Sequence, residues 1–297
     1  MLTGLQGRIE KIVPRCPRRT THKAEEHYRD QPMNTETSIT PEEVHLWLAF
    51  PDEIRDPDLL AAYRDLMPAG ERTRQQRFHF ERHGHQYLIA RALVRTTLSR
   101  YTGVAPEQWR FCINRYGRPE IESPAGLAPL RFNLSHTAGL VALAVVLKSD
   151  IGVDVEDTHR KRIGIELADR YFSETEARAL HALPPSLQRA RFFEYWTLKE
   201  AYIKAKGMGL SIPLEQFSFH MEDERPLRIS FDPSLHDRPD VWHFWLMQPT
   251  EHHKAALALR QLREPPRISF RKVAPLAEEH PIEVVLLHTS RESRSSL

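Results

Sequence analysis

The sequence WTLKEAYIKAKGMGL, residues 196–210, is the stretch around which the rest of the chain can be organised. It is rich in Ala, Leu, Lys and Glu and contains no proline, so it predicts a helix that stops near Gly207. At helical spacing Trp196 and Glu200 fall on one face, with Lys204 one turn further on. A carboxylate among apolar side chains needs a partner, because an unpaired buried charge is costly. Either Lys204 or a metal ion can be that partner, and an ordinary surface ion pair with Lys204 is the alternative.

Length and composition are those of a globular protein with a sizeable core. The chain has 297 residues, 40% of them hydrophobic and 28% charged, and a formal net charge of +2, which gives no reason to expect nucleic acid as a partner. No apolar run approaches the roughly 20 residues of a membrane helix, and the N-terminus lacks the apolar core of a secretory signal. We interpret Cys16 and Cys112 as too few and too widely spaced for a disulfide framework or a zinc site. We therefore expect a cytosolic (cytoplasmic) protein with no membrane association.

The residue pattern predicts an α+β fold in two similar halves. Each half has a long amphipathic helix and ends in a strand of small apolar residues, and a cleft between such halves is the default place for an active site. Strands are expected at 44–50, 140–146, 151–156, 217–220, 227–231, 241–247 and 255–260. Helices are expected at 57–69, 71–102, 162–171, 174–182 and 186–206.

The expected organisation is an extension, two subdomains and a tail. Residues 1–40 are polar and lack apolar periodicity, so we expect a disordered N-terminal extension, and Met33 is a candidate for the natural start. The α+β subdomains are expected at 41–149 and 150–263. From 264 to 297 we expect a C-terminal tail, with one edge strand at 281–287.

Two carboxylates project from one face of a predicted strand. In IGVDVED, which starts at Ile151, apolar residues alternate with Asp154 and Glu156, so these two side chains lie about 7 Å apart on one face. They repel each other unless a cation or a proton lies between them. With Glu200 they make a set of oxygen donors that favours magnesium over zinc. A solvent-exposed acidic strand end is the alternative.

Groups suited to phosphate stand elsewhere in the sequence. Ser135 and His136 lie in FNLSHT, and Arg118 lies in the turn YGRPE. Arg74 and Arg91, in a predicted helix, are candidate anion ligands, although each can equally belong to a solvated helix face. Glycine-rich phosphate loops, nucleophile elbows and HExxH motifs are absent from the sequence. The combination favours attack by the hydroxyl of a substrate on a diphosphate.

The motifs FNLSH, GVDVE and WTLKEAYIKAKGMGL, in this order and spacing, resemble the signatures of the 4′-phosphopantetheinyl transferases, specifically the surfactin-synthetase-activating type. The resemblance covers about residues 44–260. It implies a pseudo-dimeric monomer of two similar α+β subdomains with the active site in the cleft between them. It also implies that coenzyme A and magnesium are used to modify a serine of acyl or peptidyl carrier proteins, with release of 3′,5′-ADP.

The resemblance implies a role for each candidate residue. Asp154, Glu156 and Glu200 would hold the magnesium ion, and Glu200 would also be the base for the carrier serine. His136 and Lys204 would contact the diphosphate. The nucleotide and its 3′-phosphate would be bound by Ser135, Arg118, Arg74 and Arg91.

The basic segment HRKRIG, residues 159–164, would complement an acidic carrier protein through Arg160 and Arg162. Two other functions remain open from the residues alone. A magnesium-dependent phosphodiester or nucleotide hydrolase would use the same carboxylates but would need no carrier protein. A non-catalytic module would bind coenzyme A or RNA through its arginines.

Overall fold

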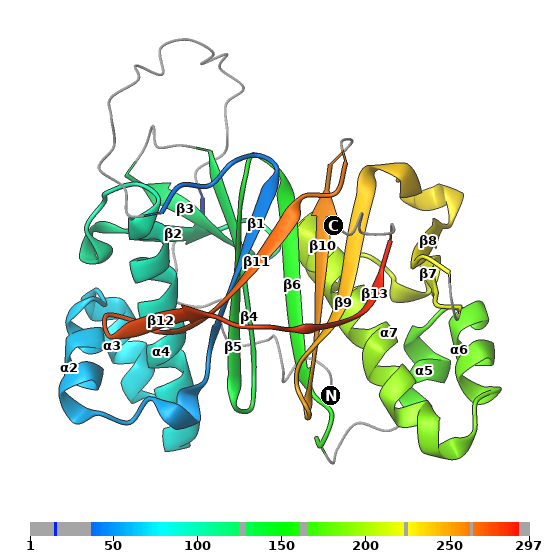
Figure 1. Cartoon of the computed structure of the whole chain (residues 1–297), viewed down its shortest axis with the longest axis horizontal. Coiled ribbons are helices and arrows are strands. Elements are labelled where there is room, and N and C mark those ends of the chain that lie inside the picture. The colour runs from blue at the N-terminus through cyan, green and yellow to red at the C-terminus, as the bar shows by residue number, and fades with distance from the viewer. Residues whose placement is uncertain are drawn as a thin grey trace, which may run out of the picture.

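The computed structural model describes residues 15–16, 37–124, 129–160, 165–222, 225–261 and 264–290, and these form a mixed α+β fold (Figure 1). One sheet has the strand order β12-β11-β1-β5-β4, and a second has the order β13-β9-β10-β6. The first contains β1 (Glu43–Ala49), β4 (Leu130–Thr137), β5 (Leu140–Leu147), β11 (Arg267–Ala274) and β12 (Glu278–Pro281). The second contains β6 (Asp150–Asp157), β9 (Trp242–Thr250), β10 (His253–Arg260) and β13 (Val285–Thr289).

Helices and two small ribbons complete the described fold. The helices are α2 (Pro57–Asp65), α3 (Ala69–Gln76), α4 (Glu81–Arg100), α5 (Glu166–Tyr171), α6 (Glu174–His181) and α7 (Pro185–Lys206). The ribbons pair β2 (Arg110–Ile113) with β3 (Pro119–Ser123), and β7 (Phe217–His220) with β8 (Arg228–Phe231). Within the described ranges, every helix is too short or too polar to cross a membrane.

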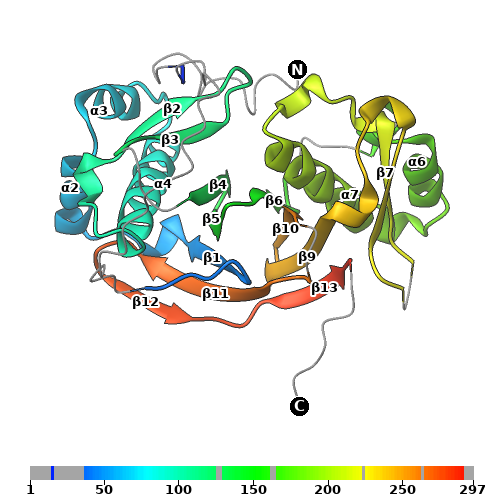
Figure 2. The ribbon, with the colours of Figure 1, turned by 90° about the horizontal axis from the view of Figure 1, so that it is seen from above.

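The two sheets share one apolar core, and a long helix covers the other side of each sheet (Figure 2). Alternation along the strands produces these layers. On β1, Leu46 faces the core between the sheets and Trp47 faces the cluster that contains α4. On β6, Val153 and Val155 face the same inter-sheet core, while the side chains between them face α7. The predicted period-two pattern of IGVDVED is therefore confirmed.

The helix predicted over residues 71–102 is wrong as one continuous element, because α3 ends at Gln76 and α4 begins at Glu81. Between them the backbone is extended at Phe80, with φ −106° and ψ 128°. The turn lets Glu71 on α3 form ion pairs with Arg91 and Arg95 on α4. In a continuous helix residues 71 and 91 would lie about 30 Å apart, so tertiary ion pairing overrides the local helical pattern.

The C-terminal segment differs from the expected tail, because residues 267–289 contain three strands. β11 pairs in parallel with β1, β12 pairs with β11, and β13 pairs with β9 at the edge of the second sheet. Alternating apolar residues in RISFRKVA, the sequence of β11, are a strand signal that the surrounding Pro and Arg residues obscured. Ile268 and Phe270 from β11 pack on the core between the sheets. The predicted disordered extension, residues 1–40, lies outside the described residues except at 15–16 and 37–40.

The two cysteines were interpreted as too few and too widely spaced for a disulfide framework, and the structure corrects this by joining them in a single disulfide. Cys16 and Cys112 form a disulfide, with their Cα atoms 5.0 Å apart. The N–H of Cys16 also donates to the carbonyl of Ile113, the last residue of β2, at 2.9 Å. A sequence separation of 96 residues does not limit the distance in space, since β2 brings Cys112 next to the N-terminal segment.

Candidate active site

Gly152 lets helix α7 lie directly against strand β6. A Cβ atom at Gly152 would stand 2.0 Å from the carbonyl oxygen of Ala201, so only glycine allows this approach of the two backbones. The approach brings Glu200 and Lys204 of α7 beside the face of β6 that carries carboxylates. The element predicted around WTLKEA and the strand predicted at IGVDVE thus form one site.

Lys204 joins three elements through its ammonium group. Its Nζ atom donates to Asp154 Oδ1 on β6 at 2.6 Å and to Ser135 Oγ on β4 at 2.8 Å. The hydroxyl of Ser135 donates in turn to Asp154 Oδ1 at 3.0 Å. The partner of Lys204 in this ion pair is therefore Asp154, whereas the helical spacing suggested Glu200.

Glu156 is held from two sides. Its Oε1 accepts a hydrogen bond from the indole N–H of Trp196 at 3.1 Å, and its Oε2 lies 3.4 Å from the guanidinium of Arg160. Asp154, Glu156 and Glu200 are all buried, with exposed fractions of 4%, 8% and 5%. The three carboxylates expected to form a cluster are thus all withdrawn from solvent.

The charges of these groups shift one another. Burial, and then repulsion by Asp154, raise the pKa of Glu156 to about 8. Burial also raises the pKa of Asp154. Burial disfavours the ammonium of Lys204, but Asp154 and Glu200 outweigh this and raise the pKa of Lys204 above its ordinary value. The shift of Asp154 reflects its burial, whereas those of Glu156 and Lys204 also reflect the neighbouring carboxylates, whose repulsion a further cation would relieve.

The donor set suits a hard divalent cation. The three side chains offer only carboxylate oxygens, and Asp154 Oδ2 is buried without a hydrogen-bond partner among the described residues. As the side chains lie, however, the described part of the chain contains no group of three His, Cys, Asp or Glu side chains close enough to enclose an ion. Magnesium does not require such a cage, since it binds through one or two carboxylates and keeps several waters.

His136 stands at the rim of this cluster with an exposed side chain. The protein around it removes enough hydration to lower its pKa, and the positive charges of Lys204 and His83 lower it further. The imidazole is therefore neutral at pH 7. Next to it, the side chain of Gln86 on α4 donates to the carbonyl of Thr137, which fixes the end of β4 against that helix.

Arg118 lies at the C-terminal end of α7. Its guanidinium donates to the carbonyl of Ala205 at 3.0 Å and to Glu120 at 3.1 Å. Gly207 ends the helix with φ 64°, and a Cβ atom there would lie 2.7 Å from Arg118 Cζ. A cation at this helix end also matches the direction of the helix dipole. These contacts hold the guanidinium of Arg118 at the carbonyl of Ala205, the residue that follows Lys204 on α7.

The other two candidate arginines lie on α3 and α4. Arg91 forms an ion pair with Glu71, and Arg95 shares the same carboxylate at 3.0 Å. Arg74 lies over the ring of Tyr87, 5.5 Å from its centroid. The structure therefore joins Asp154, Ser135 and Lys204 directly, but gives Arg91 a partner of its own.

Comparison with known proteins agrees with these motifs. The model of the 4′-phosphopantetheinyl transferase N-terminal region matches residues 55–148, and that of the 4′-phosphopantetheinyl transferase superfamily matches residues 150–259. The 4′-phosphopantetheinyl transferase HetI of Nostoc sp. is 31% identical over 230 residues, which are 77% of this chain and 92% of HetI. This chain belongs to the 4′-phosphopantetheinyl transferase superfamily.

Two further relatives extend the comparison. The 4′-phosphopantetheinyl transferase Sfp of Bacillus subtilis is 34% identical over 164 residues, covering 55% of this chain and 70% of Sfp. Among solved structures, the holo-acyl-carrier-protein synthase of Thermotoga maritima matches with a TM-score of 0.31 and 22% identity, covering 38% of this chain and 64% of that one. The resemblance drawn from FNLSH, GVDVE and WTLKEA is confirmed, and the protein is a transferase.

The contacts of three residues near the candidate site, Trp196, Lys199 and Glu176, were not predicted from the sequence. Trp196 has a usable signal, since it lies one helical turn before Glu200, but its hydrogen bond to Glu156 depends on the fold. Lys199 has no role that follows from the sequence, yet it is fully buried and forms an ion pair with Glu176 at 2.7 Å. No spacing rule connects residues 176 and 199, because the bend between α6 and α7 brings them together.

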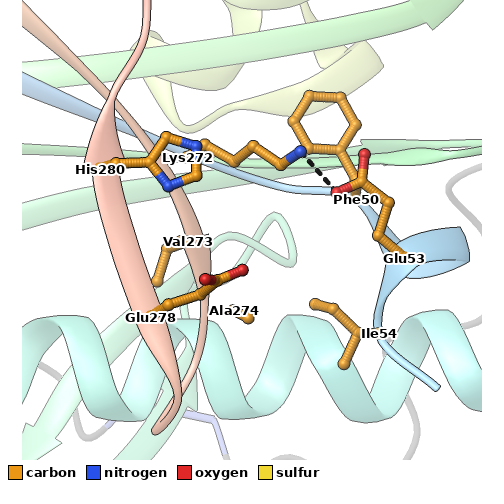
Figure 3. A pocket seen from close by; sticks show the side chains of 8 residues that line it. All are labelled: Phe50, Glu53, Ile54, Lys272, Val273, Ala274, Glu278 and His280. Carbon is orange, nitrogen blue, oxygen red and sulfur yellow. Dashed lines mark ion pairs between the residues drawn. The ribbon is translucent and has the colours of Figure 1, made fainter. Parts of the chain in front are cut away.

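A small pocket lies apart from this candidate site, between the end of β1 and the strands β11 and β12 (Figure 3). Two strands, β1 and β5, separate β11 from β4, which carries Ser135. Lys272 and Glu53 form an ion pair at its wall. The pocket is lined by Phe50, Glu53, Ile54, Lys272, Val273, Ala274, Glu278 and His280.

Proposed function

We propose that the cluster of Asp154, Glu156, Glu200 and Lys204 is the active site of a magnesium-dependent phosphopantetheinyl transfer. The donor is coenzyme A, the acceptor is a serine of an acyl or peptidyl carrier protein, and the second product is 3′,5′-ADP. The observation that carries the proposal is the Lys204–Asp154 ion pair, bridged by Ser135, within a field of buried carboxylates that already raises the pKa of Glu156.

Asp154, Glu156 and Glu200 are the residues that would hold magnesium. Two observations support this assignment: Asp154 Oδ2 is buried without a hydrogen-bond partner among the described residues, and burial together with repulsion by Asp154 raises the pKa of Glu156, which a bound cation would offset. When bound, the ion would neutralise charge that develops on the diphosphate.

Side chains of the protein accept the proton and bind the diphosphate during the transfer. The serine hydroxyl of the carrier attacks the β-phosphorus of coenzyme A, a new phosphorus–oxygen bond forms, and the bond to the leaving ADP oxygen breaks. Glu200 takes the serine proton. Lys204 uses two of its three N–H donors on Ser135 and Asp154, which leaves one for a phosphate oxygen. His136, neutral and exposed, donates to the same diphosphate.

Three of the four residues expected to bind the nucleotide keep that role in the proposal, and Arg91 receives another. Ser135, Arg118 and Arg74 are assigned to the nucleotide and its 3′-phosphate. Arg91 is already paired with Glu71, so we assign it mainly to holding α3 beside α4. In that position Arg91 acts on the nucleotide through Arg74, which lies on α3.

Three further features belong to the proposed function: the two halves of the chain, the docking of the carrier protein and the cellular location. We infer that the two sheets, each with its long helix, are the two pseudo-symmetric halves of a monomer, and that the cleft between the halves holds coenzyme A. An acidic carrier protein would dock near Arg160. Because Arg160 also contacts Glu156, its charge reversal would affect both docking and the acidic cluster. Arg162 lies outside the described residues. The cytosol remains the proposed location.

Intact-protein mass spectrometry tests the proposal. An apo acyl carrier protein is incubated with this protein, coenzyme A and magnesium, and the expected result is a mass gain of one phosphopantetheine. The gain should disappear without magnesium and in Glu200→Gln, while coenzyme A binding by Glu200→Gln persists. No gain on fatty-acid, polyketide or peptidyl carriers, with coenzyme A still bound, would contradict the proposal. Hydrolysis of coenzyme A without a carrier would indicate a hydrolase instead.

A further inference from the structure

Strands β4 and β6 are edge strands of different sheets, yet they are joined by a row of side-chain hydrogen bonds. Alternate side chains of β4 accept from alternate backbone N–H groups of β6, and residue numbers increase together on both strands. The three bonds run from Val153 N to Asn133 Oδ1 at 2.9 Å, from Val155 N to Ser135 Oγ at 3.3 Å, and from Asp157 N to Thr137 Oγ1 at 3.2 Å.

This row solves a physical problem at the junction of the sheets. An edge strand presents unpaired N–H groups, and burying them without partners is costly. Asn133, Ser135 and Thr137 are all buried, with exposed fractions of 5%, 5% and 8%. Water therefore does not readily replace these side chains as the acceptor for the N–H groups of β6. The side-chain oxygens of β4 thus accept the hydrogen bonds that the backbone carbonyls of a neighbouring strand would otherwise accept from β6.

The row also determines which side chains meet across the junction. Ser135, its central member, is the hydroxyl that bonds Asp154 and Lys204. A shift of β6 by two residues would restore the row of N–H groups but would move Asp154 about 7 Å from Ser135. Within the described part of the chain, the side chains of the outer members, Asn133 and Thr137, bond backbone N–H groups of β6 and none of the carboxylates, so these bonds act on register.

We propose that Asn133 and Thr137 are positioning residues for the transfer reaction, which fix the register between β4 and β6. They hold the coenzyme A side of the site, Ser135 and His136, against the carboxylate side, Asp154 and Glu156. The inference rests on the proposed function, because phosphopantetheinyl transfer is the reaction whose geometry the register sets.

The test compares two substitutions of one residue. Thr137→Val keeps the shape of the side chain but removes the oxygen that accepts from Asp157 N–H, whereas Thr137→Ser retains that oxygen. The expected result is a kcat of transfer lower by about 10- to 100-fold in Thr137→Val, the loss that misplacement by about 1 Å causes. KM for coenzyme A should change much less, because its ligands on β4 remain. Thr137→Ser should retain most of kcat.

Amide hydrogen exchange supplies a readout that does not depend on turnover. Exchange at Val153, Val155 and Asp157 should be faster in Thr137→Val than in Thr137→Ser, and Asn133→Leu serves as a second variant if Thr137→Val folds poorly. Equal kcat values for wild type and Thr137→Val, or equal losses in both Thr137 variants, would overturn the proposal. If wild type itself transfers nothing, the proposed function fails, and exchange at the three amides decides the register role alone. Unchanged exchange would then reject it.

Discussion

At the scale of single residues, Glu156 makes folding stability depend on pH with a definite sign. Its pKa is about 8 in the folded protein, against a reference value of 4.5. Between these values the folded state binds more protons than the unfolded state, so this residue makes stability fall as pH rises. Each unit of pKa difference corresponds to about 1.4 kcal/mol. The stability that Glu156 removes through its burial and its neighbouring carboxylates therefore increases as the pH rises towards 8.

The prediction concerns Glu156→Gln, which removes the titrating group and keeps a hydrogen-bond acceptor for Trp196. Without divalent cations, the free energy of unfolding of this variant relative to wild type should rise by more than about 1 kcal/mol between about pH 5 and about pH 8. Urea denaturation at several pH values measures it. Magnesium should stabilise wild type more than the variant at the upper end, because binding to the folded state adds stability. A difference that stays constant with pH would show that Glu156 is ionised throughout.

The sequence alone predicts which side chains of this site share a face, but not which residues they pair with. Strand periodicity predicts that Asp154 and Glu156 share a face, and helical periodicity predicts that Trp196 and Glu200 share another. Both predictions depend only on local geometry. The pairing of Lys204 with Asp154, and of Arg91 with Glu71, depends on how elements pack. Local spacing carries no information about such partners.

At the scale of elements, a buried ion pair fastens α7 to its surroundings. Lys199 and Glu176 have no exposed side-chain surface and lie 2.7 Å apart. Lys199 Nζ also donates to the carbonyls of Leu214 and Phe217, each at 2.7 Å. Glu176 accepts from the N–H of Phe219 at 2.8 Å. The pair thereby joins α6, α7 and the start of β7, directly beside the residue that we assign as the catalytic base.

Glu176→Gln should therefore destabilise the protein by about 3–5 kcal/mol, since it leaves the ammonium of Lys199 buried without its counter-charge. Chemical denaturation measures the loss. Arg178→Gln is the matched control on the same helix, because it breaks an exposed ion pair with Glu174 that is worth less than about 1 kcal/mol. Similar costs for both variants would mean that the buried pair adds little beyond a surface pair.

The elements themselves were predictable where their pattern is continuous. β7 begins and ends where FSFH predicts, and α7 follows its helical pattern to the stop at Gly207. The break between α3 and α4 was missed because its sequence, RFHF, contains neither Gly nor Pro. β11 was missed because the surrounding Pro and Arg residues obscure the alternation in RISFRKVA. Its pairing with β1 could not be predicted, since Glu43–Ala49 lies more than 200 residues before Arg267–Ala274 and local alternation does not identify a partner strand.

At the scale of the whole molecule, the chain joins its two sheets on both sides. β4 and β6 meet at one pair of edges, where the proposed site lies. β12 and β13 form the opposite edges, and they follow each other in sequence. The segment between them crosses from one sheet to the other, along the side away from the long helices (Figure 2). Ile282 and Val284, in this crossing, pack on the core that the sheets share.

Removal of residues 275–297 should therefore loosen the contact between the sheets. The truncation takes away β12 and β13, leaves β9 paired only with β10, and uncovers the core beneath Ile282 and Val284. Losing two aliphatic contacts costs about 2–4 kcal/mol, which corresponds to a fall in Tm of about 3–6 °C. Differential scanning fluorimetry measures Tm, and binding of a hydrophobic dye reports the exposed core. The control removes only residues 291–297. If both truncated proteins melt together, the crossing does not hold the sheets. If only the longer truncation lowers both Tm and the rate of transfer, the crossing between β12 and β13 helps to maintain the arrangement of β4 and β6 at the opposite edges.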